Sequence, residues 1–167
     1  PLLGSLQEQE LEALSLENAL LYLELTRKLA QAHVDVKQFE KGVEFLEQFE
    51  TVLKTNTPLK DKPDLIALNQ YEIKVVQVIQ LYRQTKYEEM IDLVETTTGS
   101  LDKEIEKYPS FERLKWLKYL FLRYSDFAYF DSDVDRSYTI RVAQQTLDTI
   151  EALSRENPNN QIFVVHY

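Results

Sequence analysis

Apolar residues recur at alternating steps of three and four through residues 87–108, and this spacing constrains the fold more than any other feature. They are Tyr87, Met90, Ile91, Val94, Thr98, Leu101, Ile105 and Tyr108. A period near 3.6 residues places them on one face of an amphipathic helix. A second apolar helical run occupies 65–82, and a short joint at 84–86 separates the two. The pair predicts a helical hairpin.

Similar hairpins are expected on either side, at about 5–54 and 110–157, with the central one at 64–108. The first joins helices at 5–36, with a break near Ser15, and at 38–54. A polar loop is expected at 55–62, and the third hairpin joins helices at 110–130 and 136–156. Residues 161–167 are expected to start a further, truncated element. None of the five prolines falls inside a predicted helix. The sequence therefore predicts an all-α single domain of six to seven helices over residues 1–167.

The hairpins also form an internal repeat. Pro58, Pro109 and Pro158 each follow a charged amphipathic helix, at spacings of 51 and 49 residues. The first helix of each hairpin is apolar around most of its circumference, which is typical of a helix packed between neighbours. The second has one charged face and one apolar face. In the last helix the inward face is expected to comprise Val142, Ala143, Leu147, Ile150 and Leu153.

The joints of the hairpins resemble tetratricopeptide repeats. In the best match, at 29–49, Leu29 and Ala30 take the Leu-Gly positions of that family, and His33 takes its tyrosine position. Phe39 stands at the turn aromatic and Gly42 at the small residue where two helices touch. Weaker matches lie at Leu81, Tyr87, Met90, Val94, Ala143, Leu147 and Ile150. The resemblance implies antiparallel hairpins stacked as a right-handed α-solenoid, in a divergent form whose period near 50 exceeds the usual length of about 34.

The net charge of the chain disfavours some classes of binding partner. A formal net charge of −9 repels nucleic acid and anionic membrane surfaces. No apolar run approaches the roughly 20 residues of a membrane-spanning helix. The chain has no cysteine, which fits a reducing compartment. We therefore expect an intracellular protein, cytoplasmic or nuclear, that binds a protein or peptide and neither inserts into membranes nor contacts nucleic acid directly.

Recognisable catalytic or metal-binding patterns are absent from the sequence. Asp131, Asp133 and Asp135 do not form a complete calcium loop, because Arg136 and Val142 occupy the positions where such a loop needs glycine and glutamate. There is no glycine-rich phosphate loop and no cysteine nucleophile, and the two histidines lie far apart. We therefore expect no enzyme activity, no catalytic residue, no cofactor and no metal.

One polar arc on the helix that begins near residue 63 stands out as a candidate partner-binding surface. The arc is uncharged, and two isoleucines one heptad apart lie within it. Exposed apolar residues at that spacing would receive a partner helix or an extended peptide. Alternatively, a neighbouring helix covers the isoleucines. The candidate residues are Ile66, Asn69, Gln70, Ile73, Gln77, Gln80 and Gln84.

These observations predict a non-catalytic scaffold or adaptor, as a fragment or subunit of a larger multiprotein assembly. One alternative is a self-contained peptide-binding module of the co-chaperone type. Such modules clamp a terminal carboxylate with lysine and asparagine, and the matching positions of this chain lack that cluster. Another alternative is a small-ligand sensor with an aromatic pocket around Trp116 and Tyr124.

Overall fold

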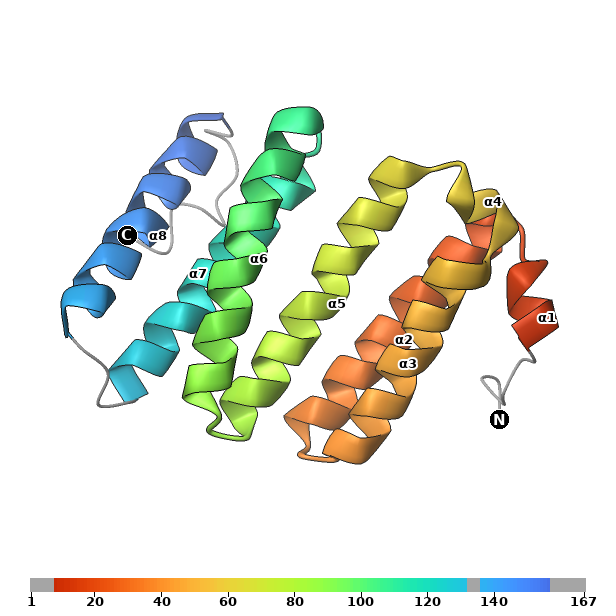
Figure 1. Cartoon of the computed structure of the whole chain (residues 1–167), viewed down its shortest axis with the longest axis horizontal. Helices are drawn as coiled ribbons and strands as arrows, with labels where there is room; N and C mark the ends of the chain where they lie inside the picture. The colour runs from red at the N-terminus through yellow and green to blue at the C-terminus, as the bar shows by residue number, and fades with distance from the viewer. Residues whose placement is uncertain (1–7, 132–135, 157–167) are drawn as a thin grey trace. The chain divides into compact units, whose positions relative to one another are not determined.

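The computed structural model describes residues 8–131 and 136–156, and these residues form helices and no strand (Figure 1). The all-α prediction is therefore confirmed. Eight helices are present over the described residues, one more than the largest number expected. They are α1 (Glu8–Glu12), α2 (Leu16–Asp35), α3 (Phe39–Thr55), α4 (Thr57–Lys60), α5 (Pro63–Arg83), α6 (Tyr87–Lys107), α7 (Glu112–Asp131) and α8 (Arg136–Glu156).

The chain divides into two compact units, unit 1 at Pro1–Arg83 and unit 2 at Gln84–Tyr167. In unit 1, α2 packs against α3 and α5, and α3 and α4 also contact α5. In unit 2, α7 contacts both α6 and α8. The single domain over 1–167 and the right-handed stacking of three hairpins stay predictions. The truncated element expected at 161–167 lies outside the described residues.

The first hairpin, α2 with α3, closes tightly at Gly42. A Cβ atom on Gly42 would lie 2.9 Å from Cγ2 of Val34 and 3.4 Å from the carbonyl oxygen of Ala30. This close approach lets Leu23 of α2 and Phe49 of α3 become fully buried. The close helix crossing expected from the small residue at position 42 is confirmed.

The turn between α2 and α3 takes the form of a Schellman motif. The Lys37 N–H donates to the Val34 carbonyl at 3.0 Å, and the Gln38 N–H donates to the His33 carbonyl at 2.8 Å. These two bonds satisfy carbonyls at the end of α2 that have no partner within the helix. Lys37 has φ 61°, and Thr85, which follows α5, has φ 58°. Left-handed backbone at a non-glycine residue is uncommon, and here it recurs at both joints.

Side chains add specific contacts between α2 and α3. The His33 ring stacks on Phe45 at 5.4 Å, and its Nδ1 lies 2.8 Å from Oε1 of Gln38. The Tyr22 hydroxyl donates to Oε1 of Gln48 at 3.1 Å. The histidine therefore has a packing role at the end of the hairpin.

Asn56 connects three segments of unit 1. Its fully buried side chain accepts a hydrogen bond from the Leu59 N–H at 3.0 Å and so caps α4. Its amide donates to the carbonyls of Leu11 and Leu14 at 3.0 and 3.1 Å. Those carbonyls lie at the break between α1 and α2, and Ser15 then caps α2. The expected break near Ser15 is confirmed. The expected loop at 55–62 is wrong, because it contains α4.

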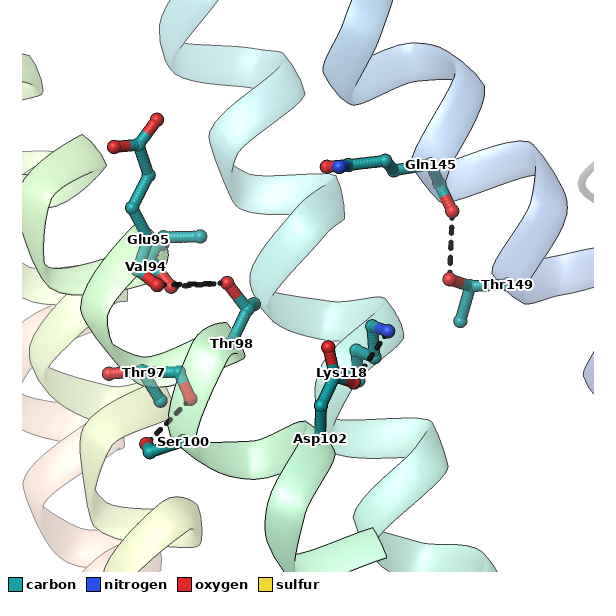
Figure 2. A network of polar contacts seen from close by, with 9 residues as sticks. All are labelled: Val94, Glu95, Thr97, Thr98, Ser100, Asp102, Lys118, Gln145 and Thr149. Atoms are coloured by element: carbon teal, nitrogen blue, oxygen red, sulfur yellow. Dashed lines mark hydrogen bonds and ion pairs between the residues drawn. The ribbon is translucent and has the colours of Figure 1, made fainter. Parts of the chain in front are cut away.

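Ion pairs connect α7 to both of its neighbours in unit 2. Nζ of Lys118 lies 2.6 Å from Oδ1 of Asp102 on α6 (Figure 2). Nζ of Lys115 lies 2.6 Å from Oε2 of Glu156 on α8. Several hydroxyl groups bond to carbonyls of their own helices, as Thr149 does with Gln145 in Figure 2. The polar contacts supplement an apolar core along α7.

The inward face of α8 differs from the expected one. Val142, Ile150 and Leu153 are buried, but Leu147 is 42% exposed. Thr146 is buried instead, because its hydroxyl reaches a polar partner on α7. The inward orientation expected for Leu147 is therefore wrong. The pattern of apolar residues along one helix does not show which of its polar side chains will bond to a neighbouring helix.

That polar partner is Asp126, a half-buried carboxyl on α7. The Thr146 Oγ1 lies 2.9 Å from Oδ2 of Asp126 and 2.9 Å from the Val142 carbonyl oxygen. A single hydroxyl proton cannot serve both acceptors at once. Over the described residues, the other oxygen of Asp126 is buried without a hydrogen-bond partner. Burial raises the pKa of Asp126 above its ordinary value of 3.8, and the hydrogen bond from Thr146 opposes that shift.

An Asp126→Asn protein should melt at a higher temperature than the parent protein at pH 7. With a raised pKa, the stability linked to this carboxyl is fully present below the unfolded value and is lost as the pH rises through the folded pKa. The neutral amide avoids that loss and can donate to Thr146, so its advantage should shrink towards pH 4. Thermal melts followed by the fluorescence of Trp116, the one tryptophan, report on unit 2.

Asp92→Asn provides the matched control for this prediction, because Asp92 is exposed on α6. We expect it to leave the melting temperature nearly unchanged at every pH. An advantage of Asp126→Asn that grows on acidification would contradict the assigned direction of the pKa shift.

Candidate partner-binding groove

A groove with a volume of about 390 Å³ runs between α3 and α5, entirely within unit 1. Its size falls at the lower end of the range of ligand pockets, roughly 300–1,000 Å³. Glu50, Leu53 and Lys54 line it from α3. The lining residues of α5 are Gln70, Tyr71, Ile73, Lys74 and Gln77.

The floor of the groove is apolar. Leu53, Tyr71 and Ile73 are buried, with exposed fractions of 8%, 7% and 5%. Leu53 lines the groove from α3, whose close approach to α2 lies at Gly42. The floor therefore consists of residues that pack between α3 and α5. A partner side chain placed on the floor would cover the surface that these residues still expose.

The rim of the groove is polar and carries one carboxylate and two ammonium groups, a net charge of one positive unit. Nζ of Lys54 pairs with Oε2 of Glu50 at 2.8 Å, and Nζ of Lys74 lies 5.6 Å from the centre of the Tyr71 ring. Such cation–π contacts favour a cation over the face of an aromatic ring. The only carboxylate that lines the groove is already neutralised by a lysine.

Two glutamine amides complete the rim. Gln70 is exposed and Gln77 is half-buried. Neither side-chain amide has a hydrogen-bond partner within the described part of the chain. Each amide offers two donors and one acceptor oxygen, so both remain available to an incoming polar group.

The structure brings together Gln70, Ile73 and Gln77 from the seven predicted site residues. Asn69 uses its amide within α5, where it donates to the Leu65 carbonyl at 2.8 Å. Three predicted residues do not line the groove, namely Ile66, Gln80 and Gln84. Of these, Gln84 lies beyond the end of α5. Ile73 forms part of the floor at 5% exposure, so for this residue the alternative holds in which a neighbouring helix covers it.

Sequence reasoning missed the contribution of α3. Glu50 and Lys54 are four residues apart, a spacing typical of an exposed ion pair on any helix. Nothing in that spacing shows which neighbour the pair faces. Lys74 and Tyr71 were missed for the same reason, since their roles depend on the side of α5 that α3 leaves open.

Trp116, one of the two aromatic residues considered for a ligand pocket, packs in the core of unit 2. Trp116 and Leu120 pack against a buried cluster of Tyr119, Ile150 and Leu153 between α7 and α8. The rings of Trp116 and Tyr119 lie 5.0 Å apart. These contacts give Trp116 a role in the core of unit 2.

The described residues provide neither a metal-binding cluster nor a membrane-spanning helix. Over residues 8–131 and 136–156, no group of three or more histidine, aspartate or glutamate side chains is placed to hold a metal ion. Asp133 and Asp135 lie outside the described residues. None of the described helices combines the length and apolar character needed to cross a membrane.

Comparisons of the chain with protein-family models, with curated proteins and with solved structures find no match. The resemblance to tetratricopeptide repeats therefore stays a prediction.

Proposed function

We propose that this chain is a non-catalytic scaffold or adaptor that holds a segment of a partner protein in the groove between α3 and α5. The observation that carries the proposal is an apolar floor flanked by two amides without partners in the described part of the chain. An apolar side chain of the partner gains free energy on the floor, and the glutamines satisfy polar groups that binding removes from water.

The dimensions of the groove favour a short extended segment. Gln70 and Gln77 are seven residues apart on α5, which corresponds to about 10.5 Å along the helix. Three residues of extended chain cover about 10 Å. A segment lying along α5 would therefore meet one amide near each end and place a side chain on Ile73 between them.

We also propose that this scaffold is built from helical repeats. The left-handed residues Lys37 and Thr85 are 48 positions apart, and so are the aromatic residues Phe39 and Tyr87 that follow them. Repetition of a turn and its first packing residue supports a helical-repeat scaffold, in which neighbouring repeats share one core. A divergent tetratricopeptide-like solenoid within a larger assembly is the arrangement that we propose.

The function is tested with peptides selected from a random twelve-residue library on the folded chain. We expect selected peptides to lose at least about tenfold in affinity on a Gln70→Trp protein, because the indole obstructs the groove at an exposed position. Affinity should change less than about threefold between 50 and 300 mM salt, because the net charge of the groove is only one positive unit and its other contacts are apolar or amide. Fluorescence polarisation measures both quantities.

Gln145→Trp is the matched control, since Gln145 is an exposed glutamine of unit 2. It should bind the same peptides with unchanged affinity. Failure to select any peptide, or equal affinities for Gln70→Trp and Gln145→Trp, would remove the groove as the binding site. Ile73→Glu is less suitable, because a charge at that buried position tests folding before it tests binding.

A further inference from the structure

A second surface of unit 1, on α2, has an apolar character that the groove does not use. Leu21, Leu25 and Val36 are 53%, 41% and 64% exposed, and Ala32 is exposed as well. Their spacings of four, seven and four residues place them along one line of about 22 Å, in which the first three lie on the helix and Val36 is its C-cap residue. We call these four residues the α2 stripe.

The stripe is separate from the face of α2 that forms the core. Ala19, Leu23, Ala30 and Val34 are fully buried on that other face. The helix is therefore apolar on two sides, and only one of them is covered in unit 1. A helix apolar on two sides is typical of a helix packed between two neighbours.

The geometry of the stripe favours a helix as its occupant. The backbone groups of α2 are bonded within the helix, so this surface offers no edge to which a strand could add. Recognition must therefore come from side chains and not from backbone hydrogen bonds. Rows of side chains four residues apart form ridges that fit the grooves of a second helix.

The charges beside the stripe determine which kind of helix fits. Glu17, Glu24 and Asp35 each lie three or four residues from a member of the stripe, and Lys28 is the one exposed cation of α2 among its described residues. Lys28 pairs with Glu24 at 2.6 Å, and Arg83 of α5 lies 3.6 Å from Asp35. Lys28 and Arg83 each pair with one of the three carboxylates, so this face keeps one negative charge, that of Glu17, without an ion-pair partner among the described residues.

We propose that the α2 stripe docks a basic amphipathic helix of a partner protein. Leucine-sized side chains of that helix pack between Leu21 and Leu25, and its lysines or arginines approach the flanking carboxylates. Glu17 has no ion-pair partner within the described residues and so offers its carboxylate directly. This surface is independent of the groove, and the two together allow unit 1 to hold two partners.

The probe is a synthetic eighteen-residue helix of leucine and lysine, with leucines at steps of three and four. Its counterpart carries glutamate in place of lysine. In NMR titrations of the whole chain, the lysine peptide should shift resonances of α2, and the glutamate peptide should leave them unchanged. Raising the salt concentration should weaken binding, in contrast to the groove, because opposite charges meet at this surface.

A protein with both Leu21→Lys and Leu25→Lys should bind the lysine peptide at least about tenfold more weakly than the parent protein. Both leucines are largely exposed, so the melting temperature should stay nearly constant. Leu147→Lys is the matched control, because Leu147 is a leucine of similar exposure, 42%, on α8 of unit 2. It should bind as the parent protein does.

Three results would overturn the proposal. The first is equal binding of the lysine peptide to the double variant and to Leu147→Lys, which would indicate general attraction to an acidic chain. The second is equal binding of the glutamate peptide. The third is self-association of the parent protein that the double variant abolishes in sedimentation, which would make a second copy of the chain the occupant.

Discussion

An Asn56→Asp protein is expected to lose about 3–5 kcal/mol of its free energy of unfolding. The substitution preserves shape and leaves an oxygen to accept from the Leu59 N–H. It replaces the amide that donates to the Leu11 and Leu14 carbonyls with a carboxylate oxygen. A charge then faces two carbonyl oxygens at about 3 Å in a site that is fully buried, and those carbonyls also lose their donor.

Asn18→Asp is the matched control for the Asn56 prediction. Asn18 is exposed in the first turn of α2, where a negative charge interacts favourably with the helix dipole. The control should change stability by less than about 0.5 kcal/mol. Thermal and denaturant melts followed by circular dichroism measure both proteins, and each kcal/mol corresponds to about 4–8 °C for a unit of this size.

Melts at acidic pH test whether the charge of the buried carboxylate causes the loss of stability in Asn56→Asp. Lowering the pH protonates the new carboxyl, which then can donate one hydrogen bond to a carbonyl. We therefore expect part of the lost stability of Asn56→Asp to return as the pH falls, relative to the parent protein. Equal stability of Asn56→Asp and Asn18→Asp at pH 7 would show that Asn56 does not join α1, α2 and α4.

Gly42→Leu should cost about 1–3 kcal/mol, the typical effect of overpacking. Even a Cβ atom at position 42 would lie 2.9 Å from Val34 Cγ2, closer than such atoms approach one another in proteins. Val34 is fully buried and branched at Cβ, so it has little freedom to move aside. The larger side chain must therefore separate α2 from α3.

Gly99→Leu is expected to raise stability, in contrast to the loss expected for Gly42→Leu. A Cβ at Gly99, in the middle of α6, meets nothing within 4 Å. Better helix propensity should therefore raise stability by about 0.5–1 kcal/mol. Circular dichroism melts compare the two variants directly. A Gly42→Leu protein that is as stable as Gly99→Leu would show that the two helices do not cross at position 42.

The long helices were predictable because their information is local. The period of apolar residues in α6 and the charged faces of α3 and α8 depend on one turn interacting with the next. The close crossing at Gly42 was expected from the resemblance of residues 29–49 to a repeat joint with a small residue where two helices touch. A glycine within a helix does not by itself show such a crossing, because Gly99 meets nothing within 4 Å. Even the break at Ser15 follows from a local capping preference.

The groove was only partly predictable. Amides and isoleucines on one arc of α5 identified Gln70, Ile73 and Gln77, because the period of a single helix determines which residues share a face. Whether Ile73 lies at the surface or under a neighbour depends on where α3 crosses. The sequence of α5 alone does not show where α3 crosses it.

By itself, the sequence determined that this protein is helical and where its long helices begin and end. These properties follow from interactions over three or four residues. Tertiary structure alone decided that Asn56 is the buried link between α1 and α4, that Thr146 replaces Leu147 in the core, and that α3 contributes one side of the groove. Each depends on a hydrogen bond or contact between residues far apart in the chain, and local periodicity carries no information about which distant segment will supply the partner.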